Sequence, residues 1–468
     1  MNLTQKFKNN IIYAFLAQGI SLCVSLLISL VVPKFLSIED FAYWQLFIFY
    51  TNYVSISQLG IVDGLYLKLG GSNFEELDYV KIGSIYKGFA LWQILLGIVI
   101  SLLACITLDE RKAFVFVAVS VYMIIYNMSR FLGYVFQSVN NTRWFSIASI
   151  IDRIIILVIG TLTIFIKKVD WKAFVIIYIL GITVSLLYTW TKGKEIVFSN
   201  KTKRFSDTII DGFSYAKIGI FLMISNFASN LILGIGRQLI ESHWGIKTFG
   251  KVSFSFSIVN FFILFINQIS LVLFPALRKV DSQTAKSIFS KLEYGFSLFS
   301  PMVYVIYIPV SYILSLWLPK YKESLQYLMV LMPICVFDGK MQMLYNTYLK
   351  VFMKEKILLL INLVSVLFSV LFCTLSVFAF ENLQVLLICL VFVIALRSIV
   401  SAIVIAKTCD IKTSKTIFFD LLFAIFFIAV CFCFGSAYSF AIILVAYFLF
   451  MFFNFKNIKN IFIRKQEV

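Results

Sequence analysis

Charged residues are scarce in this chain, and no long polar stretch occurs anywhere along its 468 residues. Asp, Glu, Lys and Arg together make up 14% of the sequence, whereas 61% of the residues are hydrophobic and 17% are aromatic. A soluble chain of this length would form about two or three domains, each with a polar surface. Because no part of the sequence is polar enough for such a surface, a water-soluble protein is excluded.

The sequence also lacks the motifs on which catalysis and metal binding usually rest. It has no GxxxxGK[ST] segment, which excludes a built-in nucleotide motor, and it has neither a nucleophile elbow nor an HExxH pair. Its only histidine, His243, has no cysteine or carboxylate pair near it, and the eight cysteines show no metal-ligand spacing. We therefore expect no catalytic residues, no metal and no cofactor, and a protein that is not an enzyme.

Fourteen long apolar stretches dominate the sequence. About 20 apolar residues in a helix span the hydrocarbon core of a bilayer, and lipid tolerates almost no other backbone arrangement except closed barrels. The sequence therefore predicts an all-α polytopic membrane protein with about 14 transmembrane helices, the last two divided at Gly435. The predicted spans are 11–32, 41–62, 84–107, 113–137, 146–166, 171–191, 214–240, 250–274, 295–318, 325–349, 357–379, 384–406, 418–435 and 437–455.

The net charge of +18 follows the predicted topology. With the N-terminus placed in the cytoplasm, the cytoplasmic segments hold roughly 24 Lys and Arg residues and the external loops about 9, which is the positive-inside bias of membrane proteins. Segments 192–204, 278–291 and 456–465 contribute much of this excess, and the external loop 167–172 argues against it. Both termini are then cytoplasmic. The basic residues set the orientation and attract anionic lipid headgroups, and we expect no nucleic-acid partner.

A weak internal repeat appears when the chain is shifted by about 208 residues, as in many transporters. Gln18 then falls on Asn226, and Asn52 falls on Asn260, without a gap across the first two spans. This duplication predicts two six-helix lobes, formed by spans 1–6 and 7–12, and an extra C-terminal helix pair. The predicted divisions are an N-lobe at 1–191, a basic cytoplasmic linker at 192–213, a C-lobe at 214–406, and the last two helices with a basic cytoplasmic tail at 407–468.

Four of the predicted helices carry polar side chains along one face. At about 100° per residue, Gln45, Asn52 and Asp63 fall within about 20° of one another on the second helix. Such residues often form hydrogen bonds between membrane helices, but their recurrence on four helices paired by the repeat favours a shared polar cavity. The stripes of the first, seventh and eighth spans include Gln18, Asn226, Asn230, Arg237, Ser253, Asn260 and Asn267.

Several other charged residues lie within predicted spans, where a charge near the membrane centre costs about 2.5–3.5 kcal/mol. We expect several of them to neutralise one another across helices or to reach the interface. Because adjacent residues on a helix do not face each other, Asp152 and Arg153 should contact different neighbours. Asp338 and Lys340, about 200° apart, should point in opposite directions. These charged residues are Arg130, Asp152, Arg153, Asp338, Lys340 and Arg397.

Two segments resemble a known family. Residues 32–46 (VPKFLSIEDFAYWQL) resemble the junction between the first two helices of bacterial polysaccharide exporters, and residues 58–65 (QLGIVDGL) resemble the end of their second helix. With its spans and its duplication, the whole chain resembles the Wzx-type O-antigen and oligosaccharide flippases of the MATE/MOP transporter superfamily.

The resemblance implies a substrate and a mechanism. The substrate would be an oligosaccharide joined through pyrophosphate to a polyprenyl lipid, and it would move from the cytoplasmic to the outer leaflet of the bacterial inner membrane. The two lobes would rock in alternating access, and the extra helix pair would shape a groove for the lipid tail. Further implied partners are membrane lipids, the polysaccharide polymerase and the chain-length machinery.

The resemblance also implies roles for the polar residues. Arginine suits pyrophosphate because it stays charged and binds oxygens in a bidentate manner. Arg237 is therefore the main expected headgroup contact. Asp63 is expected to bind a coupling cation, from a proton or sodium gradient, or to hold Arg237. The remaining predicted cavity residues are Gln18, Lys34, Gln45, Asn52, Lys68, Lys217, Asn226, Asn230 and Asn260.

Two other transporters of the same superfamily compete with this interpretation. A lipid II flippase would keep cationic residues in the middle of its first helix, where this chain has Ser and Gln. A MATE-type antiporter of organic cations would need a cavity rich in carboxylates, and Asp63 is the only acidic residue on the predicted stripes. A polysaccharide polymerase would need a large external loop, and every predicted external loop is short.

Overall fold

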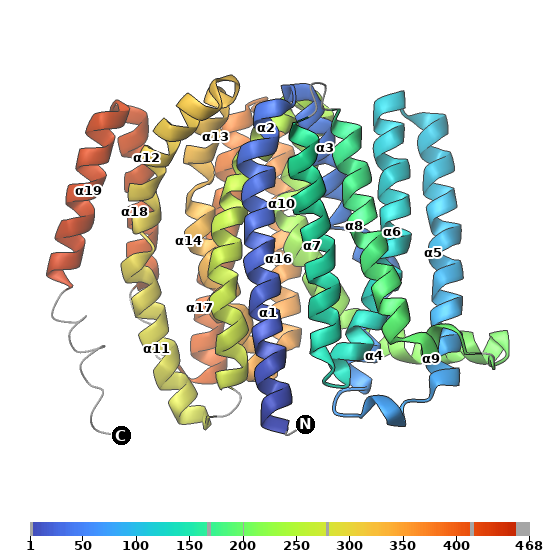
Figure 1. The fold of residues 1–468 in the computed structure, drawn as a ribbon. Coiled ribbons are helices and arrows are strands. Elements are labelled where there is room, and N and C mark those ends of the chain that lie inside the picture. Colours follow the sequence, from blue (N-terminus) through green and yellow to red (C-terminus); the bar gives the residue numbers. More distant parts are fainter. Residues whose placement is uncertain (1–2, 166–169, 200, 278–279, 412–415, 455–468) are drawn as a thin grey trace. The chain divides into compact units, whose positions relative to one another are not determined.

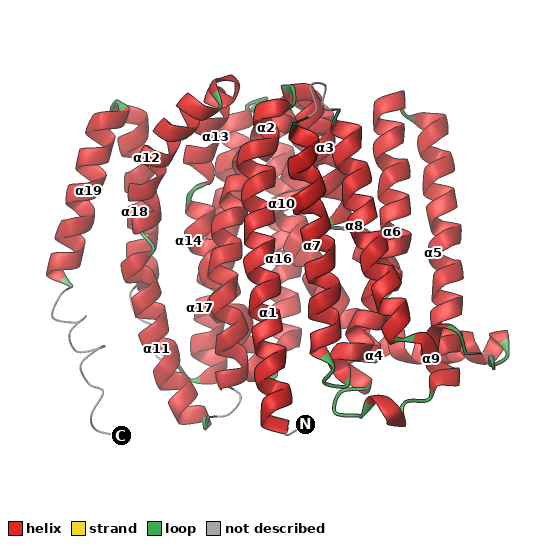
Figure 2. Cartoon of the chain, viewed as in Figure 1, coloured by secondary structure: helices red, strands yellow, loops and turns green. Residues whose placement is uncertain are grey.

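The computed structural model describes residues 3–165, 170–199, 201–277, 280–411 and 416–454. These residues form helices and short connections, and no strand occurs among them (Figure 2), so the predicted all-helical class is confirmed. The chain divides into two compact units, residues 1–230 and 231–468. The predicted basic tail 456–465 and parts of the loops at 167–172 and 278–291 lie outside the described residues.

In the described residues of the first unit, nine α-helices and three short helical turns precede α10. They are α1 (Leu3–Leu26), the π-helical turn η1 (Leu27–Val31), α2 (Val32–Phe35), α3 (Ile38–Thr51), η2 (Val54–Gln58), α4 (Ile61–Lys68), η3 (Phe74–Glu76), α5 (Tyr79–Thr107), α6 (Glu110–Ser138), α7 (Thr142–Ile164), α8 (Trp171–Lys192) and α9 (Lys194–Val197).

The long element α10 (Phe205–Leu277) begins in the first unit and ends in the second, with a break at Gly245 (φ 78, ψ 175). The second unit continues with α11 (Ser282–Phe299), α12 (Met302–Trp317), η4 (Pro319–Tyr321), α13 (Lys322–Leu331), α14 (Pro333–Lys340), the π-helical turn η5 (Met341–Tyr345), α15 (Asn346–Val351), α16 (Glu355–Phe378), α17 (Leu383–Cys409), α18 (Thr416–Cys433) and α19 (Ser436–Phe453).

Ten helices in the described part of the chain are long and apolar enough to cross a membrane, and the bent pair Pro319–Leu331 and Pro333–Val351 makes eleven. Each predicted span nevertheless overlaps helical segments in the described residues. The element Phe205–Ser270 holds two of them, the span 41–62 is broken into short pieces, and the apolar helix Ala437–Phe453 is shorter than 18 residues. These three cases account for the difference from the predicted number.

The second predicted span is not one continuous helix, which corrects the sequence analysis. Helix α3 ends at Thr51, the 3₁₀ turn η2 follows, and α4 starts only at Ile61. Leu59 (φ 51) and Gly60 (φ 78) both have left-handed backbone conformations, which an α-helix does not tolerate. The angular relationship of Asp63 to Gln45 and Asn52 that was predicted for a regular helix therefore does not hold.

Neighbouring helices pack side by side in the first unit, as α5 and α6 show most plainly (Figure 1). Helix α7 packs against both α8 and α1. A large aromatic and aliphatic cluster fills the cytoplasmic end predicted for this unit, with Phe131, Leu132 and Phe136 fully buried. This burial fixes α5, α6 and α4 around one core.

The second unit has its own core around α14, η5 and α17. Tyr345 and Tyr348 are fully buried there beside Phe289 of α11. The bend of 44° between the two parts of the Pro319–Val351 segment lies at Pro333, which lacks the N–H that a continuous helix needs. The C-terminal helices belong to this unit, because α18 packs against α11 and α19 packs against α12.

Candidate functional site

Arg237 lies on the first arm of α10 in the second unit, and its contacts cross the break at Gly245. Its Nη2 donates a hydrogen bond to Oγ of Ser253, 3.0 Å away on the second arm. The guanidinium also lies 5.4 Å from the ring centroids of Phe249 and Phe256. The predicted polar stripes of the seventh and eighth spans therefore meet at this arginine.

Arg237 is also partly exposed, whereas Ser253 is fully buried. A guanidinium stacked on aromatic rings keeps its charge. Asn260, two turns beyond Ser253 on the same arm, is exposed. The two arms of α10 thus carry a guanidinium on the stripe of the seventh span and an exposed amide on the stripe of the eighth.

In the first unit, the earlier part of α10 contacts the broken second span. The hydroxyl of Tyr53 donates to the backbone oxygen of Asn230 at 3.3 Å, and its ring packs against Phe227 with centroids 5.9 Å apart. The side chains of Asn226 and Asn230 are exposed. Asn52, directly before Tyr53, is also exposed, and its Nδ2 donates to the backbone oxygen of Ile48 at 3.0 Å.

Gln45 and Asp63 do not share the exposure of Asn52. Gln45 is buried on α3 with 3% of its surface exposed, and Asp63 is buried on α4 with 7% exposed. Asp63 is separated from Asn52 by the backbone breaks at 52–60, whereas Gln45 lies on α3, the helix that Asn52 caps. The predicted polar stripe on the second span is wrong in this respect.

The predicted cationic contacts of the first unit lie at the surface. Lys34 on α2, Lys68 on α4 and Lys217 on α10 all have exposed side chains. The Lys68 ammonium lies 4.8 Å from the ring centroid of Tyr215. Gln18 on α1 is half-buried. None of these contacts identifies a ligand, and their role stays a prediction.

A buried polar network that the sequence analysis missed holds the broken second span in place. Nδ2 of Asn127 donates to the backbone oxygen of Val54 (3.1 Å), to Oγ of Ser57 (2.8 Å) and to Oε1 of Gln93 (2.9 Å). Oδ1 of Asn127 accepts a hydrogen bond of 2.7 Å from Gln58. Irregular backbone inside a membrane protein is tolerated where its polar groups are satisfied by protein, and this network satisfies them.

The side chains of α5 complete this network. Nε2 of Gln93 donates to the backbone oxygen of Ser57 at 3.0 Å, and Nε1 of Trp92 donates to the same oxygen at 2.9 Å. In the sequence, the only indication of this network was the presence of single amide side chains within apolar helices. Their partners are 34 to 73 residues away, a separation that no helical periodicity can reveal.

The charged residues of the tenth predicted span form two separate buried ion pairs. Asp338 lies 3.2 Å from Nη1 of Arg397, whose Nε donates to Asn362 at 3.0 Å. Lys340 lies 2.8 Å from Asp420 on α18. The expectation that Asp338 and Lys340 point to different neighbours is confirmed, as is the neutralisation of Arg397 by another helix.

The expectation for Asp152 and Arg153 is wrong. Nε of Arg153 lies 3.8 Å from Oδ2 of Asp152, because the long arginine side chain turns back along its own helix. Its Nη1 also donates to the hydroxyl of Tyr178 at 3.2 Å. Arg130 lies 4.9 Å from the ring centroids of Tyr126 and Phe145. These contacts within the first unit are structural.

No group of three or more His, Cys, Asp or Glu side chains that could hold a metal ion occurs among the residues that the structure describes. His243 packs against the rings of Trp244 and Phe378. Among the predicted cavity residues, the exposed polar groups are the amides of Asn52, Asn226, Asn230 and Asn260 and the ammonium groups of Lys34, Lys68 and Lys217, which can bind and orient a polar ligand.

No family model matches this chain, and no curated protein matches its sequence. Solved membrane-transporter structures do match its fold. The lipid II flippase MurJ in an inward closed conformation has a TM-score of 0.62 at 13% identity, covering 96% of this chain and 99% of that chain.

Two MATE transporters are also similar in fold. An inward-facing multidrug resistance MATE family transporter of the MOP superfamily has a TM-score of 0.60 at 11% identity, covering 84% of this chain and 94% of that chain. A MATE transporter from Vibrio cholerae has a TM-score of 0.56 at 15% identity, covering 89% of this chain and 98% of that chain. The chain therefore has the fold of these transporters and flippases.

Proposed function

We propose that this protein is a flippase that moves a polyprenyl-pyrophosphate-linked oligosaccharide, such as an O-antigen or capsule repeat unit, across the bacterial inner membrane. The substrate moves from the cytoplasmic to the outer leaflet by alternating access of the two predicted lobes. A sugar headgroup and a pyrophosphate cannot cross hydrocarbon unaided, because burying unpaired polar and charged groups is prohibitive. A polar passage replaces water for the headgroup while the lipid tail stays in the bilayer.

The contact between Arg237 and Ser253 carries this proposal. It brings together two polar stripes that the sequence predicted independently, and it leaves a partly exposed guanidinium fixed by two aromatic rings. A positioned arginine suits a pyrophosphate, whose oxygens it binds in a bidentate manner. The exposed amides of Asn226, Asn230 and Asn260 suit sugar hydroxyls, since each amide both donates and accepts.

The extent of the structural matches supports a lipid-linked substrate. The lipid II flippase matches 96% of this chain, and the inward-facing MATE transporter matches 84%. In the C-terminal pair, α18 is attached to the second unit through the ion pair of Lys340 and Asp420, and α19 packs against α12 and α18. In our proposal this helix pair contributes to a groove for the polyprenyl tail.

The main alternative is a cation-coupled antiporter of the MATE type, because two of the neighbours carry that description. An antiporter of organic cations needs accessible carboxylates. Asp63 is the one acidic residue among the predicted cavity residues, and it is buried. A lipid II flippase is the second alternative, and it differs from our proposal only in the sugar headgroup.

Deletion of the gene followed by lipid extraction separates these functions. Our proposal predicts that unpolymerised polyprenyl-linked repeat units accumulate on the cytoplasmic side and that surface polysaccharide is lost. Unchanged glycolipid pools with increased sensitivity to cationic dyes would instead indicate the antiporter. Accumulation of lipid II with arrested growth would indicate the peptidoglycan precursor as substrate.

A further inference from the structure

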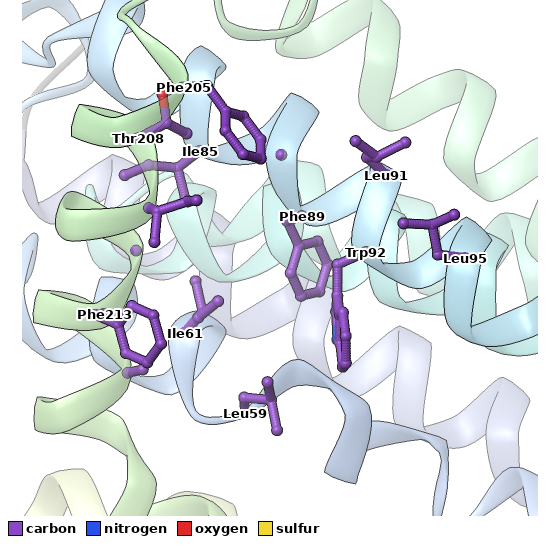
Figure 3. A pocket seen from close by; sticks show the side chains of 14 residues that line it. Leu59, Ile61, Ile85, Phe89, Leu91, Trp92, Leu95, Phe205, Thr208 and Phe213 are labelled. Atoms are coloured by element: carbon purple, nitrogen blue, oxygen red, sulfur yellow. The ribbon is translucent and has the colours of Figure 1, made fainter.

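A cavity lies within the first unit, and none of the predicted substrate residues lines it. Its volume is about 500 Å³. Helix α5 forms one wall and the beginning of α10 forms the other, and Leu59 and Ile61 close one end (Figure 3). The lining residues are Leu59, Ile61, Ile85, Gly88, Phe89, Leu91, Trp92, Leu95, Phe205, Thr208, Ile209, Gly212, Phe213 and Ala216.

The cavity is apolar and open to the side. Thr208 is the only lining residue with a side-chain hydroxyl, and its Oγ1 donates to the backbone oxygen of Arg204 at 3.1 Å. Several lining side chains are strongly exposed, among them Leu95 at 53% and Phe213 at 72%. Because these exposed side chains are apolar, we expect the opening to face the hydrocarbon of a bilayer, where acyl chains can fill it.

The walls of the cavity are fixed by contacts outside it. The Trp92 indole is held by its hydrogen bond to the backbone oxygen of Ser57. Leu59 is held in its left-handed conformation at the end of η2, which the Asn127 network stabilises. Gly88 approaches α10 closely, since a Cβ there would lie 3.3 Å from Cγ2 of Thr208. The hollow is therefore built into the fold.

Gly212 leaves the space open. It lies on α10 and lines the cavity, and a Cβ added there would meet no heavy atom within 4 Å. Its φ is not positive, so the backbone accepts a larger side chain, and a helix favours one over glycine. A substitution at this position fills the cavity without displacing the backbone.

Cationic side chains gather where α10 begins, next to Phe205. Nζ of Lys87 donates to the backbone oxygen of Ser199 at 2.7 Å, and the backbone N–H of Lys203 donates to Oγ of Ser84 at 2.9 Å. Lys87 belongs to α5, and the bond to Ser84 places the backbone of Lys203 beside the same turn of that helix. Arg204 directly precedes Phe205 and is exposed.

Three carboxylates partly offset these charges. Asp211 lies 2.7 Å from Nζ of Lys81 and 2.9 Å from Nζ of Lys203. Asp78 also interacts electrostatically with Lys81, and Asp207 lies in the first turn of α10. Counting Lys81, Lys87, Lys203 and Arg204 against Asp78, Asp207 and Asp211, the cluster keeps a net positive charge. An anionic headgroup complements it, because each Lys or Arg near a membrane surface contributes about 1 kcal/mol to the binding of anionic lipid.

We propose that this cavity binds one acyl chain of an anionic glycerophospholipid of the surrounding bilayer, with its phosphate beside Lys87, Lys203 and Arg204. The bound lipid is a structural partner at the surface of the first unit and is not the transported molecule. The inference does not depend on the proposed function, because it rests on the cavity, its lateral opening and the adjacent cations.

The test compares Gly212→Leu with Gly295→Leu, full-length proteins purified in detergent after incubation with vesicles of phosphatidylglycerol or phosphatidylcholine. Gly295 is a matched control, because a Cβ there also meets nothing within 4 Å but the residue lies on α11. Native mass spectrometry measures the retained lipid. We expect Gly212→Leu to retain about tenfold less phosphatidylglycerol, since each excluded methylene contributes about 0.8 kcal/mol. Equal retention by Gly212→Leu, Gly295→Leu and the wild type overturns the proposal.

The headgroup is tested with Arg204→Gln and Lys87→Gln. Each should reduce the preference for phosphatidylglycerol over phosphatidylcholine about fivefold. An unchanged preference in both variants overturns the headgroup assignment. A polyprenyl phosphate recovered from the wild type in place of phospholipid overturns the choice of ligand.

A measurement on the wild type covers the case in which Gly212→Leu does not fold. Phosphatidylglycerol carrying a diazirine on one acyl chain is crosslinked in vesicles, and the labelled peptides are mapped. Labels concentrated in residues 85–95 and 205–216 support the cavity. Labelling that is no stronger there than at the exposed apolar face of α16, which includes Leu360 and Leu367, overturns it.

Discussion

The ammonium of Lys340 lies 2.8 Å from the carboxylate of Asp420, and each side chain is only 1% exposed. Ser297 accepts a second hydrogen bond from this ammonium at 2.7 Å and donates its own proton to Asp420 at 2.9 Å. The three side chains come from α14, α18 and α11. The ion pair therefore connects the C-terminal helices to the core of the second unit.

Breaking this pair should be strongly destabilising. Asp420→Asn or Lys340→Met leaves one charge buried without its partner, which typically costs about 3–5 kcal/mol. The double variant Lys340→Met with Asp420→Leu should recover most of the loss. Thermal unfolding in detergent measures the changes. The control is Lys251→Met at the more exposed pair with Glu323, where about 0–1 kcal/mol is expected. If Asp420→Asn and Lys340→Met lower the unfolding temperature no more than Lys251→Met does, the stabilising role of the buried pair is contradicted.

Asn127→Leu should destabilise the first unit. The change removes the partners of Val54, Ser57, Gln58 and Gln93, and each buried polar group left unsatisfied costs about 1–3 kcal/mol. Asn226→Leu, at an exposed asparagine on α10, should leave the unfolding temperature nearly unchanged. Equal unfolding temperatures for the two variants would show that the network does not hold the broken span.

Gly64→Ala should separate α4 from α10. A Cβ on Gly64 would overlap the backbone oxygen of Tyr215, and a Cβ on Gly219 would overlap that of Gly60. Backbone cannot yield as a flexible side chain does, so overpacking should cost about 1–3 kcal/mol. Gly295→Ala is the control with open space around the new Cβ. Thermal unfolding of both variants tests this contact. An unchanged unfolding temperature for Gly64→Ala would rule out a close contact between α4 and α10.

Arg237→Ala should abolish complementation of a deletion strain while membrane expression stays normal. Arg237→Ala removes the proposed contact with the pyrophosphate. Arg237→Lys should keep only part of the activity, because lysine lacks the bidentate geometry of arginine. Arg143→Ala is a matched control, since Arg143 also bonds a hydroxyl (Tyr13, 3.0 Å) and lies over an aromatic ring but is on none of the predicted stripes. Full activity of Arg237→Ala would remove this residue from the site.

The positions of the membrane helices could be predicted because hydrophobic length is a local property. The predicted division at Gly435 lies between the end of α18 at Cys433 and the start of α19 at Ser436. The break in the second span could not be predicted. Gly60 alone did not indicate it, and the side chains that stabilise it come from α5 and α6, far along the chain.

The sequence predicted that buried charges pair between helices, but it did not identify the partner of each charge. The need of Arg397 for an opposite charge followed from the cost of a buried charge, but the sequence did not identify Asp338 as its partner. The sequence likewise did not indicate Asp420 as the partner of Lys340. At the candidate site, the stripes of the two arms of α10 could be predicted from periodicity, as the Arg237 contact with Ser253 shows. Asp63 was misplaced because the helical periodicity of the second span ends at Thr51.

In our proposal, the exposed amides of Asn52, Asn226 and Asn260 line a passage filled with water. Single cysteines are placed at Asn52, Asn226 and Asn260 in a background in which the eight native cysteines are replaced. Ile106 (79% exposed) and Leu367 (69% exposed), on the apolar faces of α5 and α16, serve as controls. The measurement is the rate of labelling by a charged, membrane-impermeant maleimide in intact membranes.

A passage predicts fast labelling at the three asparagine positions and slow labelling at the two controls, because the reactive thiolate forms only where water reaches it. Labelling at Asn52, Asn226 and Asn260 that is as slow as at Ile106 and Leu367 would contradict the passage and the transport mechanism built on it.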